Sequence, residues 1–242
     1  MPYIKKVNKQ TNMEIKKNSK YVRMIMILLS FIVFHFSLVS VSAQTPVRQI
    51  TIKEVFKAMP DSLIPYLSQN NRLDFIDFME SNMEAKVTNS LNGISRMDIM
   101  NDQFLSLTLN EASKVQIRLL PVSEPVDSMQ QIICLVHTLG VKGLESTVSF
   151  YSCSWRPLQL SINGIVTTNE VLVQPTSMPD DRFQELKAML MPYMFWASLS
   201  ETEDVLTIGL SEANISTDDK EDMKLILRLI KLKWNGVTFN KV

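Results

Sequence analysis

The stretch FLSLTLNEASKVQIRLL, residues 104–120, determines the fold class of this chain. Apolar side chains alternate with polar ones on both sides of a short polar interval. When Asn110 is paired with Lys114 across a three-residue loop, Leu107 lies opposite Ile117, and every apolar residue within 105–109 and 115–119 falls on one face. The stretch therefore predicts an antiparallel hairpin with one buried face. The residues expected to point outward include Thr108 and Gln116.

Two further strands are predicted after this hairpin, over residues 131–139 and 145–155. Gly140 and Gly143 mark the turn between them. The strand 131–139 is apolar on both faces, so it is expected in the interior of a sheet. The first β set is thus predicted over residues 103–157.

A second β set, predicted over residues 193–238, resembles a shortened copy of the first. The spacing across the loop 201–204 aligns three apolar pairs, which are Leu199 with Leu206, Ala197 with Ile208 and Phe195 with Leu210. A third strand is predicted over residues 230–234, and residues 170–173 are a candidate strand between the two sets. The likeness of the sets leaves two explanations open, an internal duplication or the general similarity of antiparallel hairpins.

Helices are expected in the region 50–84, where apolar residues recur at helical spacing. They are predicted over residues 52–58 and 63–67, and from Asn70 onward. The buried face of the third is expected to carry Leu73, Ile76, Met79 and Met83, and to be widened by Phe75 and Phe78. One more helix, residues 181–190, begins after an aspartate cap and ends before a proline. The chain is therefore predicted to be α+β, with N-terminal helices packed on antiparallel β-meanders and one further helix between the β sets.

Residues 1–43 have the three parts of a secretory signal. A basic segment precedes the apolar run from Met24 to Val41, and small residues end it at Ala43. The alternative is a membrane anchor, because the run approaches the length of about 18 residues at which a span becomes possible. Cleavage after Ala43 would leave a single mature α+β domain, residues 44–242, without a stable membrane span. A more ordinary basic segment begins at Met13, which makes the true start an open question.

The charge of the mature chain differs from that of the whole. Residues 1–43 contain seven of the 25 basic residues and one of the 25 acidic residues, which leaves 18 against 24 and a formal net charge of −6. Phosphate binding needs clustered cations, so nucleic acid is not expected as a partner. The partner is otherwise unknown, with an envelope protein or an apolar ligand as candidates.

Few residues could carry chemistry. His137 is the one histidine outside residues 1–43, and its apolar strand favours a packed side chain over a catalytic base. The two cysteines form no CxxC pair, so a tetrahedral zinc site is not predicted. Six glycines form neither a phosphate loop nor a dinucleotide fingerprint. The sequence therefore predicts no catalytic residue, no metal and no cofactor.

The cysteines Cys134 and Cys153 lie on two strands of one predicted hairpin. A turn centred near residues 141–142 places Cys134 opposite residue 149, so Cys153 is about 13 Å further along. That separation exceeds what a disulfide tolerates. Both thiols are predicted to be free.

A segment rich in methionine and aromatic residues begins at the end of the helix 181–190 and extends beyond it. Its members are Met189, Met191, Met194, Phe195 and Trp196. One explanation is a core patch under the helix. The other is a groove for an apolar ligand or a partner chain, which adaptable methionine side chains would suit. These five residues are the candidate ligand-binding residues.

Several segments resemble a known family. They are residues 53–63, 70–73, 76–79, 119–122, 130–134, 149–151 and 155–158. Together they resemble the uncharacterised exported family of domain of unknown function 3256. The resemblance is most specific over residues 53–80 and 119–158. It implies a periplasmic or cell-envelope address, and it carries over no catalytic residue.

Three functions remain in view. The first is an exported cell-envelope protein that acts as a non-enzymatic binding or structural module. The second is a carrier that holds an apolar ligand between the sheet and the helices, with the segment 189–196 as lining. The third is a carboxylate-dependent hydrolase. A filled core would favour the binding or structural module. A cavity beside the helix 181–190 would favour the carrier, and a cleft with facing acids would favour the hydrolase.

Overall fold

The computed structural model describes residues 20–21, 23–24, 49–213 and 215–242. The predicted signal 1–43 and its cleavage point lie outside these residues, apart from 20–21 and 23–24. Residues 1–46 and 47–242 form two separate units, and the second holds all the elements described below. None of the helices among the described residues has the length and hydropathy needed to cross a membrane.

Two antiparallel sheets make up the folded unit, which confirms the α+β class. The first sheet is a six-stranded meander of β1 (Lys86–Thr88), β2 (Ile94–Met100), β3 (Phe104–Asn110), β4 (Ser113–Val126), β5 (Met129–Leu139) and β6 (Glu145–Ser152). The second has four strands, β7 (Phe195–Leu199), β8 (Val205–Leu210), β9 (Ile230–Trp234) and β10 (Phe239–Lys241). β5 is an interior strand buried on both faces, as its sequence predicts.

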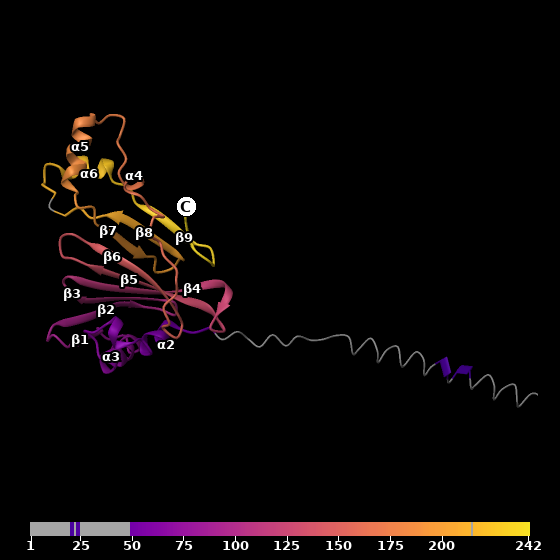
Figure 1. The fold of residues 1–242 in the computed structure, drawn as a ribbon. Helices are drawn as coiled ribbons and strands as arrows, with labels where there is room; N and C mark the ends of the chain where they lie inside the picture. Colours follow the sequence, from indigo (N-terminus) through magenta and orange to yellow (C-terminus); the bar gives the residue numbers. More distant parts are fainter. Residues whose placement is uncertain (1–19, 22, 25–48, 214) are drawn as a thin grey trace, which may run out of the picture. The chain divides into compact units, whose positions relative to one another are not determined.

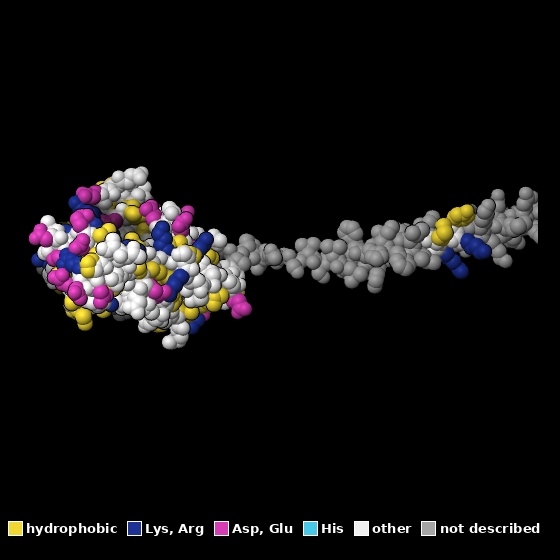
Figure 2. Space-filling view, turned by 90° about the horizontal axis from the view of Figure 1, so that it is seen from above, with side chains coloured by type: hydrophobic (Ala, Val, Ile, Leu, Met, Phe, Trp, Pro, Cys, Tyr) yellow, Lys and Arg dark blue, Asp and Glu magenta, His cyan; other side chains and the backbone are white. Residues whose placement is uncertain are grey.

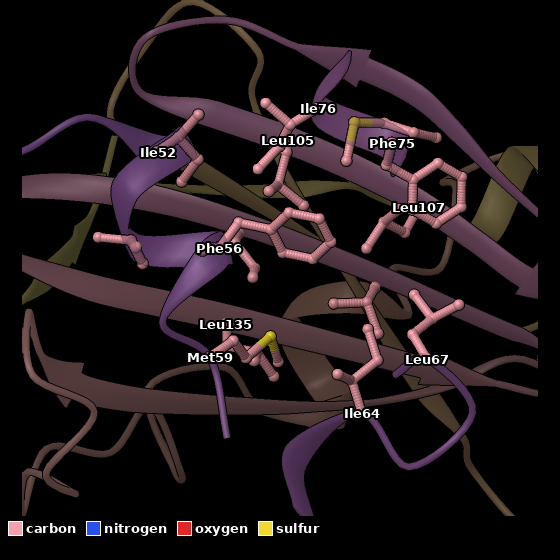
Figure 3. Packing of buried hydrophobic residues seen from close by; sticks show 14 of the residues in the cluster. Ile52, Phe56, Met59, Ile64, Leu67, Phe75, Ile76, Leu105, Leu107 and Leu135 are labelled. Atoms are coloured by element: carbon pink, nitrogen blue, oxygen red, sulfur yellow. The ribbon is translucent and has the colours of Figure 1, made fainter. Parts of the chain in front are cut away.

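The helices α2 (Ile52–Lys57) and α3 (Gln69–Glu80) pack against one face of the first sheet. Phe56 points from α2 at the sheet, where Leu105 and Leu107 lie beneath it in one buried cluster (Figure 3). Trp155 joins this cluster, and its indole N–H donates to the carbonyl of Val55 (2.9 Å). A mainly apolar contact layer therefore joins helices and sheet.

The segment between these helices differs from the prediction. In place of a helix over residues 63–67 there is a short 3₁₀ turn, Asp61–Leu63. Ile64 then leaves the helical region (φ −145°, ψ 63°), as expected for a residue before proline, where the α conformation is sterically disfavoured.

The buried face of α3 also differs from the prediction. The helix begins at Gln69, one residue earlier than predicted, after a capping box between Ser68 and Asn71. It ends at Glu80. Met83 therefore falls outside the helix and is exposed. The fully buried residues of α3 are Arg72, Phe75 and Ile76.

The first sheet starts earlier than residue 103, because β1 and β2 precede the predicted hairpin. Neither strand was predicted. They bury only Val87, Ser95 and Met97, and a polar turn separates them, so their sequence has little apolar alternation. The buried amide of Asn89 supports the turn by donating to Ser95 Oγ and to the carbonyl of Leu109.

The hairpin β3–β4 buries the predicted face, but the prediction of a single buried face is wrong. Phe104 and Leu120, on the opposite face, are buried in the cluster between the two sheets.

The register of the hairpin also differs from the prediction. The turn contains two residues, and Leu109 is an extra residue in a β-bulge. Leu107 consequently faces Val115 and not Ile117. Leu107 and Ile117 are nevertheless both fully buried, because a register shift of two residues leaves each side chain on the same face of the sheet.

The hairpin β7–β8 has the predicted register in all three apolar pairs. Residues 170–173 are not a strand: α4 (Thr168–Val171) is a single helical turn with a Thr167–Glu170 capping box. Only Leu172 makes a lone β-bridge, to Leu227. The helices α5 (Asp180–Met189) and α6 (Lys220–Ile226) pack together through a third buried cluster.

The inner face of the second sheet packs on the first sheet, on the face opposite α2 and α3. In Figure 1, α2 and α3 lie below the six-stranded sheet, β7–β9 lie above it, and α5 and α6 are at the top. On the face seen in Figure 2, acidic and basic side chains are interspersed. The unit is thus built in layers of helix, sheet and sheet.

Candidate functional site

An aromatic cluster fills one end of the space between the sheets. Trp234 of β9 stacks on Phe150 of β6 with ring centroids 6.1 Å apart, and Phe239 of β10 meets Trp234 edge-on at 5.3 Å. The indole N–H of Trp234 donates to the carbonyl of Pro121 on β4. This hydrogen bond fixes the ring between the two sheets and makes it the floor of a surface groove.

The groove has a volume of about 420 Å³ and opens beside Trp234. Ile132 lies at its base, and the end of β4 forms one wall with Val122 and Val126. Gly236 closes the rim: its φ is +95°, and a Cβ there would lie 2.4 Å from Ser123 Oγ. Ser123 also donates its backbone N–H to the Gly236 carbonyl (3.0 Å). The remaining lining residues are Ser123, Glu124, Leu158, Leu160 and Val237.

Residues 158–166, here called the strap, run along the open side of the two-sheet layer. They form no helix or strand, and Leu158, Ile162 and Val166 pack against the inter-sheet cluster. A second cavity of about 270 Å³ lies at the other end of the strap, between β6 and β7. The strap therefore separates two cavities that open on one apolar layer.

Polar contacts hold the sheets together away from the groove. Arg118 of β4 is buried, and its Nε donates to Asp204 Oδ1 (2.9 Å). Its Nη1 donates to the carbonyls of Ser200 and Glu201 (3.2 and 3.1 Å). The first sheet thereby fixes the β7–β8 loop.

Gln116 and Ser146 make a second set of contacts between the sheets. Gln116 Oε1 accepts the backbone N–H of Leu199 (3.0 Å), and Ser146 Oγ accepts that of Ala197 (2.9 Å). The prediction that Gln116 lies outside is therefore wrong, since its side chain is half-buried against β7. Thr108 is likewise only half-buried, and its hydroxyl donates to Asp98 Oδ2 (2.8 Å).

The structure does not bring the five candidate ligand-binding residues together. Met189 and Met191 are exposed on and after α5. Met194 reaches toward Gly143, where an added Cβ would lie 2.4 Å from its terminal carbon. Phe195 and Trp196 line the second cavity. The space between α5 and the second sheet is filled by a buried cluster that includes Phe183, Leu186, Leu190 and Leu210.

His137 does have a partner that the sequence did not indicate. Its Nε2 lies 2.9 Å from Ser113 Oγ, because adjacent strands bring the two side chains together. Burial lowers the pKa of His137, so the imidazole is neutral near pH 7. The serine hydroxyl is itself buried, and neither residue lines the groove or the second cavity. The pair has the character of a packing contact.

Both cysteines are free, buried thiols. Cys134 faces Phe150 across the strand pair and lies in the inter-sheet layer. Cys153 donates its S–H to the carbonyl of Gln131 (3.1 Å). Burial raises the pKa of Cys153 to about 11 and raises that of Cys134 further, so neither is a thiolate near pH 7.

Many of the carboxylates are held by arginines. Asp61 pairs with Arg72 and Asp127 with Arg156. Arg182 joins Glu185, Asp219 and Asp222, which ties α5 to α6. Among the described residues, no group of three or more histidine, cysteine or acidic side chains could hold a metal ion. The arrangement favours structural roles for these acids.

The groove residues were not identified from the sequence. Val122 and Val126 belong to the end of β4, and Val237 lies in the β9–β10 turn more than a hundred residues later. One local signal existed: Leu158, Leu160 and Ile162 alternate with polar residues in a segment where no strand was predicted. Such alternation indicates that one side of the segment covers an apolar layer.

Comparison with known proteins finds a matching family and a solved structure of similar fold. The model of a family described as protein of unknown function (DUF3256) matches residues 39–239. The solved structure of a domain of an uncharacterised protein from Porphyromonas gingivalis W83 is similar, with a TM-score of 0.59 and 22% sequence identity. That likeness covers 81% of this chain and 99% of the other, and at this identity it concerns the fold. No curated protein matches the chain.

Proposed function

The chain belongs to the DUF3256 family, and from its own residues we propose that it is an exported cell-envelope protein that acts as a non-enzymatic binding module. The groove beside Trp234 is the binding site. The observation that carries this proposal is an open, largely apolar groove of about 420 Å³ at the junction of two sheets. Ligand sites in proteins are of this size and are mostly apolar with a few polar groups.

The chemistry of the remaining side chains supports a binding role over catalysis. The histidine is neutral and packed against a buried serine, and the thiols are protonated. Three of the acidic side chains are held in ion pairs, Asp61 by Arg72, Asp127 by Arg156 and Asp219 by Arg182. The filled cluster beneath α5 is the outcome expected for a binding or structural module, and it leaves the segment 189–196 without a ligand cavity of its own.

Export is proposed from the sequence of residues 1–43. Their basic segment, apolar run and small residues before Gln44 have the order of a cleaved secretory signal. Intact-mass measurement of the protein from its producing cell tests this, and the expected mature N-terminus is Gln44. Protein recovered from membranes with the apolar run still attached would contradict the proposal.

The binding role is tested with N-phenylnaphthylamine, a neutral apolar fluorophore. Val237 at the groove rim is replaced in Val237→Asp, which places a charge where an apolar ligand would enter. The affinity for the probe is expected to fall roughly fivefold or more, because a carboxylate beside an apolar ligand loses hydration.

The chain offers a matched control. Val141 is similarly exposed (68% against 61% for Val237) and lies in the β5–β6 turn, outside the groove lining. Val141→Asp is expected to bind the probe as the unchanged protein does. Equal affinities for both variants, or no probe binding by the unchanged protein, would contradict the groove as the site.

A further inference from the structure

The strap covers the inter-sheet layer with aliphatic side chains but is weakly held. Every residue from 157 to 166 is at least partly exposed, in contrast to Phe150 and Ser152 on the neighbouring strand, which are buried. Leu158 donates its N–H to the Phe150 carbonyl (2.9 Å) and Ile165 donates to Ile162 (3.1 Å). Segments with few buried contacts and few backbone hydrogen bonds to the rest of the molecule open at low free-energy cost.

The two cavities beside the strap share one kind of lining. The groove is lined by Leu158 and Leu160, and the second cavity by Ile162 and Val166. The volumes are about 420 and 270 Å³. Glu124 is the single ionisable side chain in either lining, and it lies exposed at the groove. No lysine or arginine among these lining residues could hold an anionic head group.

We infer that the strap is a displaceable cover, and that an uncharged, unbranched alkyl chain takes its place and occupies both cavities as one channel. The inference rests on the proposed groove-binding function and names its ligand class. The strap itself indicates the chemistry, because Leu158, Ile162 and Ile165 pack against the layer that the alkyl chain would contact. A ligand that competes with them must present aliphatic surface.

An alkyl chain fits this site better than an added peptide strand. A strand between β6 and β7 would need both edges free over several residues. Ser146 Oγ already joins the edges by accepting the Ala197 N–H at 2.9 Å. An alkyl chain needs no backbone hydrogen bonds and can follow the apolar side chains past this contact.

The test uses the mature chain, since residues 47–242 form a compact unit of their own. Decanol is titrated into the isotope-labelled protein, and backbone amide shifts are followed. Amides of the groove (Ile132, Gly236), of the second cavity (Val148, Ala197) and of the strap (Gln159, Asn163) are expected to shift together with one dissociation constant. Shifts confined to the groove would overturn the strap inference and leave the groove proposal standing.

A pair of strap variants tests competition. Ile165→Ala removes an aliphatic strap side chain that packs against the inter-sheet cluster and lines neither cavity, so the open state becomes more populated and decanol is expected to bind roughly fivefold more tightly. Gln159→Ala changes an exposed strap side chain and is expected to leave the affinity unchanged. Unchanged or weaker binding by Ile165→Ala would show that the strap does not compete, and would overturn the inference.

The ligand class is tested with three further probes. Decanoate is expected to bind roughly tenfold more weakly than decanol, because its carboxylate would lose hydration without gaining a cation. Decyltrimethylammonium is expected to bind no better than decanol, since Glu124 is exposed to solvent. Tighter binding of either ion would overturn the uncharged assignment. A synthetic peptide copying residues 156–166 is expected not to bind, and binding tighter than that of decanol would identify a peptide as the occupant.

Discussion

The central hairpins of the two sheets have the same alternating pattern but close differently. In β7–β8, Ser200 donates its N–H to the Val205 carbonyl (2.9 Å), and the strands pair in the predicted register. In β3–β4, Asn110 Oδ1 accepts the Ala112 N–H (2.8 Å) within a two-residue turn. Leu109 is then an extra, unpaired residue in β3, and the loop is one residue shorter than predicted.

The difference shows which part of a hairpin each kind of residue determines. Alternation with a period of two determines the face, and both hairpins have the face that their sequences predict. The register can still change in steps of two, since such a shift returns every side chain to the same face. Turn residues such as Asn110 decide between these registers, because they hydrogen-bond the local backbone.

The largest expected effects are at the hairpin centres. Leu107→Ala in the first sheet and Leu206→Ala in the second each remove a fully buried side chain, and each is expected to lower the free energy of unfolding by about 2–5 kcal/mol. Urea unfolding followed by circular dichroism and tryptophan fluorescence measures both. Leu139→Ala, at an exposed position of β5, is the control and should stay within about 0.5 kcal/mol.

The same urea unfolding measurement tests whether the two hairpins belong to one folding unit. Coincident transitions by both probes are expected, because the sheets share one buried layer and should unfold as one unit. A separate early transition in Leu206→Ala would mean that the second sheet unfolds alone. The two hairpins would then belong to independent folding units.

The next effect concerns the ion pair that joins the hairpins. Arg118→Ala leaves Asp204 and two loop carbonyls without their donor, and is expected to cost about 3 kcal/mol. Arg182→Ala removes a more exposed arginine from the α5–α6 network, and should cost clearly less, because water screens its ion pairs. Thermal or urea unfolding distinguishes them. Equal losses would show that burial of Arg118 adds nothing to its contribution.

A smaller effect is expected from the amide that supports β7. Gln116→Ala removes the acceptor of the Leu199 N–H, and should cost about 1 kcal/mol. Lys114→Ala changes an exposed residue on the same face of β4, and is expected to stay within about 0.5 kcal/mol. Chemical denaturation of the two variants side by side measures the difference. Equal free energies of unfolding for the two variants would mean that water replaces the glutamine as hydrogen-bond acceptor without loss of stability.

The smallest effect depends on pH. The ammonium of Lys241, followed by the Thr167 N–H and hydroxyl, lowers the pKa of Glu170 from 4.5 to about 2. A carboxyl group with a lowered folded pKa stabilises the fold above its unfolded pKa and loses that contribution as pH falls. The difference in melting temperature between the unchanged protein and Glu170→Gln should therefore be largest above pH 4.5 and vanish toward pH 2. A difference independent of pH would contradict this origin.

The sequence predicts the fold well where alternation is strong and poorly where polar contacts replace it. One buried face of each of β3, β4, β7 and β8 follows from the spacing of apolar residues, whereas burial of the second face of β3 and β4 does not. β1 and β2 escape prediction because Ser95 and Asn89 bury polar groups that only the fold can satisfy. The helix predicted over residues 63–67 fails at Pro65, whose effect on the preceding residue outweighs the apolar spacing.

The candidate site was less accessible to prediction, because it depends on contacts distant in sequence. Pro121 and Trp234 meet across 113 residues, and this contact positions the groove floor. The methionines after α5 matched the composition of a ligand site, but their positions spread them over separate surfaces. Composition can indicate that a segment suits apolar ligands; only the chain's path decides whether its side chains converge.

The contacts of Gln116 and Ser146 with β7 have a consequence for association between molecules. β7 is the outermost strand of its sheet, and such strands can recruit a strand from another chain through free N–H groups. Here the N–H groups of Leu199 and Ala197 are occupied by side chains of the first sheet. Two polar side chains thus shield this border against intermolecular strand pairing, and a variant lacking both would expose a template for fibre growth.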